Sequence, residues 1–109
     1  MTDNKKSSYK EMTSIDEPIT FYGFRWVDWM HENHPDLVSE MKRKDIFHMV
    51  AMSIDKSAWD YRDLLESQYA NFHPRPETFE EIVKWEFTRN FYIDSSVMRE
   101  KVLIPLTSF

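Results

Sequence analysis

The sequence predicts an all-α protein, and three observations lead to this fold class. The 109 residues include one glycine, too few for the positive-φ turns that β-hairpins need. Two long stretches repeat apolar residues at steps of three or four, which is the period of a helix. Prolines stand at the start of one predicted helix and in the break between the two long ones. We therefore expect a small helical bundle, in which two shorter N-terminal helices precede two long antiparallel helices.

The start of the chain predicts an arm ahead of one folded domain. Residues 1–18 are mostly charged or hydroxyl-bearing and end at Pro18, a composition typical of a flexible arm. Residues 19–109 carry the apolar periodicity, and we expect them to form a single helical domain. A chain of this length buries roughly 65% of its unfolded surface, which is enough for one core.

Two short helices should come first in this domain. The first is predicted at about 24–32, directly after Gly23, whose position indicates a turn or a close approach of the backbone. The second begins at Pro35, a residue favoured in a first helical turn, and ends near Lys42. The side chains expected to be buried are Trp26, Trp29 and Met30 in the first helix and Leu37, Val38 and Met41 in the second.

The longest periodic stretch is residues 45–72, which we expect to be one helix capped by Asp45. No other stretch has so clean a period, so the remaining helices should pack around this one. Its predicted core stripe consists of Phe47, Val50, Ile54, Ala58, Tyr61, Leu65, Tyr69 and Phe72.

A last helix is predicted from residue 79 to about residue 103. The proline-dense segment 72–76 forces a chain reversal, and Thr78 with Glu81 fits a capping box at the start of the helix. Pro105 prevents continuation. The residues that continue at helical spacing along this helix are Phe79, Ile82, Val83, Phe87, Asn90, Phe91 and Val97.

Composition narrows the classes of function. The chain has no cysteine, which excludes disulfides, thiolate metal sites and thiol nucleophiles. No apolar run reaches the length of a signal peptide or a membrane span, so we expect a cytoplasmic protein. The net charge is −5, and the central helix is its most acidic part. This charge disfavours uniform attraction to nucleic acid.

The sequence offers no pattern of residues typical of catalysis. His31 and His34 are three apart and precede a proline, whereas the zincin motif needs a spacing of four on a continuous helix. We interpret His48 and His73 as surface or capping residues, and the neighbouring carboxylates as surface charge. We therefore expect no metal site, no cofactor and no enzymatic activity.

Two groups of residues remain as candidate binding sites. The first is an apolar spot in an acidic surround on the central helix, which suits docking onto a basic protein surface. In the alternative interpretation, its tryptophan packs against the N-terminal helices. This partner-binding group consists of Met52, Asp55, Trp59, Asp60, Asp63 and Glu66.

The second group combines basic and aromatic residues, as proteins that bind single-stranded nucleic acid do. Its basic members are Arg25, Lys42, Arg43 and Lys44, next to Trp26 and Trp29. In the alternative interpretation these residues do not bind nucleic acid. The basic side chains then stabilise the end of a helix, and the aromatic side chains are buried in the core.

The order of residues resembles the TnpV-like proteins, a family of small proteins encoded on transposons and conjugative elements of Gram-positive bacteria. The similarity covers about residues 19–106. The chain departs from the family where the usual glycine-lysine between the short and long helices is replaced by Arg43-Lys44-Asp45. The resemblance implies a mobile genetic element as the source and supplies no established activity. The residues that carry it are Tyr22-Gly23, Arg25, Trp29-Met30, Glu32, His34-Pro35, Leu37, Ile54-Asp55, Ala58, Lys84-Trp85, Arg89-Asn90 and the run Glu100 to Ile104.

Together these observations lead to two hypotheses on function. The first is a non-enzymatic mobile-element protein that binds and inhibits a host nucleic-acid-handling defence protein. It would act as an anti-CRISPR-like inhibitor whose acidic helix occupies the basic channel of a Cas nuclease. The second is an accessory protein of transposition or conjugation that contacts DNA through the basic group and the lysines of the N-terminal arm. A homodimer is compatible with both hypotheses.

Overall fold

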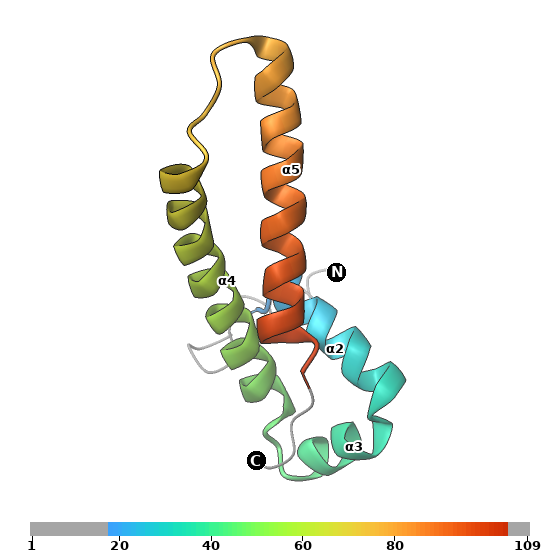
Figure 1. Cartoon of the computed structure of the whole chain (residues 1–109). Helices are drawn as coiled ribbons and strands as arrows, with labels where there is room; N and C mark the ends of the chain where they lie inside the picture. The colour runs from blue at the N-terminus through green and yellow to red at the C-terminus, as the bar shows by residue number, and fades with distance from the viewer. Residues whose placement is uncertain (1–17, 105–109) are drawn as a thin grey trace, which may run out of the picture. The chain divides into compact units, whose positions relative to one another are not determined.

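The computed structural model describes residues 18–104, and all the regular secondary structure in this range is helical. The predicted all-α class is confirmed (Figure 1). None of these helices has the length and apolar character needed to cross a membrane. The predicted arm, apart from Pro18, and the last five residues lie outside the described part of the chain. In chain order the elements are α2 (Phe21–Asn33), α3 (Pro35–Arg43), α4 (Phe47–Phe72), α5 (Phe79–Val97) and the π-helix η2 (Met98–Val102).

The chain divides into two compact units, and the boundary falls inside helix α4, after Lys56. Unit 1 contains α2, α3 and the first part of α4. Unit 2 contains the rest of α4 with α5 and η2. Helix α4 runs without a break through this boundary. The single domain expected for residues 19–109 stays a prediction.

Helices α2 and α3 of unit 1 form where the sequence predicts them. The first is longer than expected and includes Gly23 in its first turn. His34 separates the two helices, and Pro35 occupies the first turn of α3. Trp26 is buried and stacks on the ring of Phe47, with 5.4 Å between ring centroids. The predicted core of these helices is confirmed for Trp26, Met30, Val38 and Met41, whereas Trp29 and Leu37 are half-buried, and Tyr22 joins the core unpredicted.

The predicted cap of the long helix is wrong, because α4 begins at Phe47 and Asp45 ends α3 instead. Asp45 has a φ of 60°, in the left-handed region. Its backbone N–H donates to Lys42 O, and the N–H of Ile46 donates to Met41 O, at 3.0 and 2.9 Å. This pair of bonds is a Schellman motif, which usually has glycine at the left-handed position.

The buried side of α4 is rotated from the predicted stripe. Ala58 and Leu65 are buried as predicted, but Ala51 and Asp55 are buried as well, and Phe72 is 79% exposed. The remaining members of the predicted stripe are half-buried: Phe47, Val50, Ile54, Tyr61 and Tyr69. A polar residue thus lies on the inner side of the helix, and Phe72 was wrongly assigned to the core.

In unit 2 the end of α4 and α5 form an antiparallel hairpin (Figure 1). The ring of Tyr69 lies 5.9 Å from that of Trp85, whereas the earlier Tyr61 lies under the ammonium group of Lys101. The indole N–H of Trp85 donates to His73 O at 2.9 Å, which ties the connecting segment to α5. Thr78 accepts from the N–H of Glu81 at 3.3 Å, as the predicted cap requires.

Five of the seven residues predicted to share one side of α5 are exposed, and Asn90 is the polar one among them. Val97 is buried and Ile82 half-buried, but the buried side also includes Ile93 and Ser96. Four apolar side chains point to solvent instead: Phe79, Val83, Phe87 and Phe91. Helix α5 is thus apolar on two sides, and the hairpin covers one of them.

Candidate functional site

Asp55, predicted as part of a docking surface, is a structural residue. Its carboxylate is 8% exposed and accepts from the backbone N–H groups of Thr20 and Gly23, at 2.9 and 2.8 Å, and from the Thr20 hydroxyl. Thr20 precedes α2 and makes no side-chain cap of its own. Asp55 therefore caps α2 from a different helix, where the positive end of the helix dipole favours a negative charge. We remove Asp55 from the candidate site.

Met52 is half-buried and belongs to unit 1. The remaining four predicted residues all lie on the part of α4 that belongs to unit 2. We call these four the acidic face: Trp59, Asp60, Asp63 and Glu66.

Trp59 belongs to a short row of side chains along α4. The guanidinium carbon of Arg62 lies 6.0 Å from the centroid of the Trp59 ring. Arg62 Nε also donates to Glu66 Oε2 at 3.2 Å. Arg62 thus contacts both the Trp59 ring, three residues before it, and the Glu66 carboxylate, four residues after it. Trp59 keeps 38% of its surface exposed, so the ring is both oriented and accessible.

Asp60 and Asp63 lie on the exposed side of α4, away from the buried Leu65. Together with Glu66 they place three carboxylates within two helical turns. Over residues 57–104 unit 2 has nine acidic and six basic residues, which gives a net charge of −3. The acidic face therefore combines one partly exposed aromatic ring with a negative surface, which suits a basic partner surface.

The basic group predicted as the alternative site lies in unit 1, and its members have partners there. Arg43 and Lys44 both pair with Glu40. The Lys42 ammonium group lies 5.5 Å from the Phe47 ring, and Arg25 lies 4.8 Å from the Phe21 ring. These interactions match the interpretation in which basic residues balance a helix end and cover aromatic side chains.

The histidines belong to local packing arrangements. His31 Nδ1 lies 3.0 Å from the carbonyl oxygen of Val27, and His34 contacts the Trp29 ring edge-on. Among the described residues no three histidine or carboxylate side chains form a group that could hold a metal ion.

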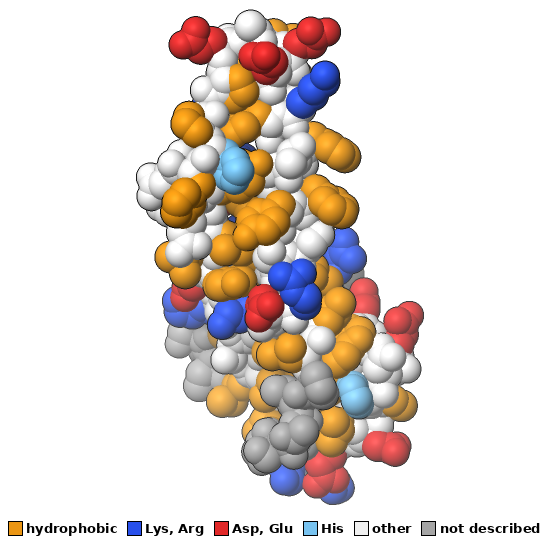
Figure 2. All heavy atoms as spheres, in the orientation of Figure 1, with side chains coloured by type: hydrophobic (Ala, Val, Ile, Leu, Met, Phe, Trp, Pro, Cys, Tyr) orange, Lys and Arg blue, Asp and Glu red, His pale blue; other side chains and the backbone are white. Residues whose placement is uncertain are grey.

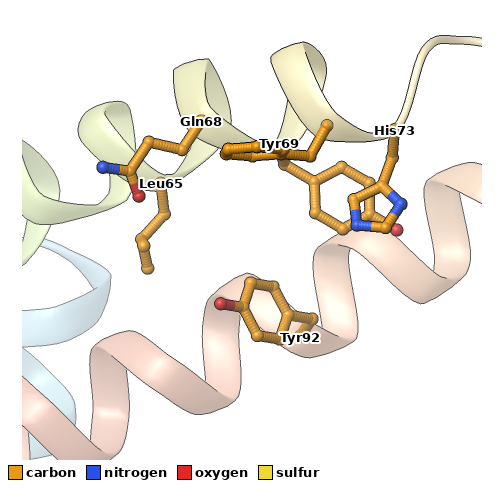
Figure 3. A pocket seen from close by; sticks show the side chains of 6 residues that line it. Leu65, Gln68, Tyr69, His73 and Tyr92 are labelled. Carbon is orange, nitrogen blue, oxygen red and sulfur yellow. The ribbon is translucent and has the colours of Figure 1, made fainter.

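A pocket that sequence reasoning missed lies between α4 and α5, with a volume of about 350 Å³. Tyr69 stacks on His73 with 4.4 Å between ring centroids, and Tyr92 lies 5.9 Å from Tyr69. Tyr92 projects from α5 into the space between the helices (Figure 3). The pocket depends on the pairing of the two helices, so no pattern within one helix predicts it. Its lining consists of Leu65, Gln68, Tyr69, Phe72, His73 and Tyr92.

A second feature absent from the predicted sites is the exposed apolar line on α5, which we call the α5 ridge: Phe79, Val83, Phe87 and Phe91. Figure 2 shows hydrophobic side chains along the hairpin of unit 2 and acidic side chains near its connecting loop. The signal was present in the sequence as a repeat of four residues. These residues were predicted on the same side as Ile82 and Val97, because the pattern within one helix does not show which of its apolar sides is covered.

These features define a small all-α protein whose candidate sites are surfaces on a helical hairpin. The chain matches no known family model, no curated protein and no solved structure.

Proposed function

We propose that this is a non-enzymatic protein that binds another protein through the acidic face of α4. The observation that carries the proposal is Trp59, partly exposed and held by Arg62 next to the exposed Asp60 and Asp63. Partly buried aromatic anchors supply most of the binding energy in protein interfaces. Charges around such an anchor set the choice of partner and the association rate.

The class of target follows from the charge of this surface. Carboxylates spaced along a helix present negative charge at intervals, so they fit a groove that normally holds phosphates. We therefore propose as target a nucleic-acid-handling enzyme with a basic channel, of which an RNA-guided Cas nuclease is one example. Occupation of that channel would inhibit the enzyme. The resemblance to mobile-element proteins supports a defence enzyme of the host as the target class.

The test is a pull-down of the tagged chain from a Gram-positive host lysate, with and without nuclease treatment. The site variant carries Asp60→Lys, Asp63→Lys and Glu66→Lys. The control carries Glu77→Lys, Glu80→Lys and Glu81→Lys, three exposed acids near the start of α5. Each reversal adds two charges, so both variants change the net charge from −5 to +1.

We expect a nucleic-acid-handling protein to be retained after nuclease treatment, by the native chain and by the control but not by the site variant. Retention by all three proteins would show that the acidic face is not the binding surface. Recovery only with intact nucleic acid would favour the DNA-contacting accessory protein. That alternative also predicts DNA affinity that falls by roughly 0.9 log units per log unit of salt for each phosphate contacted.

A further inference from the structure

The α5 ridge is a second exposed surface, distinct from the acidic face. Its four members follow each other at steps of four residues and are 81, 50, 74 and 69% exposed in chain order. The buried Ile93 and the half-buried Trp85 lie on the other side of the same helix. Packing against α4 therefore leaves the ridge uncovered.

The exposed apolar area of the ridge is large for a protein of this size. A phenylalanine side chain has on the order of 200 Å² to bury, so these exposed fractions amount to about 500 Å² of contiguous apolar surface. Patches of roughly 300–600 Å² are the largest that monomers usually expose, and they are often functional. The ridge alone supplies more than half of the ~800 Å² that each partner contributes to a standard interface.

The spacing of the ridge fits a second copy of the same surface. Side chains four residues apart form a ridge along a helix. Two such ridges interdigitate when their helices cross at about 50°. Two antiparallel copies related by a two-fold axis would meet midway between Val83 and Phe87. Phe87 of each copy then lies opposite the smaller Val83 of the other, and Phe79 lies towards Phe91. Such an interface is self-complementary and closes at two copies.

The charges near the ridge favour the antiparallel arrangement over the parallel one. Glu77, Glu80 and Glu81 are exposed at the N-terminal end of the ridge. Thr88 and Asn90 beside its C-terminal half are uncharged, and one carboxylate, Asp94, follows Phe91 by three residues. A parallel pair would bring two acidic clusters together. An antiparallel pair places each cluster of three carboxylates next to an end of the other copy that carries one carboxylate, Asp94. Lys84 lies near the centre of the ridge. The carboxylate of Glu80, one turn away, offsets the positive charge of Lys84.

We infer that the α5 ridge is the interface of a two-fold homodimer. The acidic face is on α4 and takes no part in this contact. The inference is therefore independent of the proposed function, and each can fail without the other.

The first test is sedimentation equilibrium of the full chain from micromolar to submillimolar concentration, for native protein, Phe87→Ser and Phe24→Ser. Phe24 is a matched control, because it is 57% exposed on α2 in unit 1. We expect a monomer–dimer equilibrium that Phe87→Ser weakens at least about 30-fold, as for an interface hot spot, and that Phe24→Ser leaves unchanged. A native chain that is monomeric at every concentration would overturn the inference, as would equal weakening by both variants.

The second test does not depend on a destabilising change. The chain has no cysteine, so a single introduced thiol is unique. A short thiol cross-linker should join Lys84→Cys chains, whose thiols lie near the two-fold axis. It should not join Glu77→Cys chains, because Glu77 precedes α5 and lies eight residues from the centre, which puts those thiols about 20 Å apart or more. Cross-linking of Glu77→Cys as fast as Lys84→Cys would exclude the antiparallel ridge.

Discussion

The carboxylate of Asp55 should be one of the largest single contributors to the stability of unit 1. It accepts two backbone N–H groups and one hydroxyl at the start of α2. The N–H of Gly23 is buried, so water cannot replace the carboxylate there without rearrangement. We therefore predict that Asp55→Ala strongly destabilises the fold.

The size of the effect follows from these bonds. A hydrogen bond to a charged group contributes about 1.5–3 kcal/mol, and loss of a helix cap costs about 1 kcal/mol. The three bonds share one carboxylate and are not additive, so we expect a loss of about 3 kcal/mol for Asp55→Ala. Asp55→Asn keeps one carbonyl oxygen as an acceptor and should lose about 1–2 kcal/mol. At roughly 5 °C per kcal/mol, Asp55→Ala should lower Tm by about 15 °C.

The measurement is thermal and urea unfolding followed by circular dichroism. Asp63→Ala is the control, because it removes an exposed carboxylate from the same helix and should change the stability by less than about 0.5 kcal/mol. The free energy of unfolding should be highest for the native chain, lower for Asp55→Asn and lowest for Asp55→Ala. If Asp55→Ala unfolds within about 2 °C of Asp63→Ala, the carboxylate does not stabilise α2 and the reasoning is refuted.

Two further substitutions test the backbone of unit 1 by urea unfolding. Gly23→Ala should destabilise by about 1–2 kcal/mol, because overpacking outweighs the better helix propensity of alanine. The new Cβ would lie 2.8 Å from Ile19 Cβ and 3.0 Å from Asp55 Cβ. An unchanged urea midpoint would show that these two side chains move aside without a loss of stability. Asp45→Gly should stabilise by about 0.5 kcal/mol, because glycine adopts the φ of 60° without the steric cost paid by other residues. Asp36→Gly, within α3, should do the opposite, and a lower midpoint for Asp45→Gly would contradict the assigned role.

The sequence by itself determined the helices and several of their ends. Pro35 in a first turn and Thr78 as a cap act on groups within a few residues, so their effects can be predicted without knowledge of the fold. The period of the apolar residues likewise located the long helices to within a few residues. Of the two alternatives predicted at Gly23, a turn or a close approach, the structure has the close approach, and the sequence did not indicate its partners, Ile19 and Asp55.

Only the tertiary structure decided which side of each helix is covered. Asp55 follows the same helical period as a surface acid, and its burial depends on α2, whose N–H groups it accepts. Phe87 follows the period of a core residue, yet α5 packs by another side, and the ring is exposed. Periodicity states which residues share a side of a helix. It does not state which side meets a neighbour, because burial depends on the pairing of residues that are distant in the sequence.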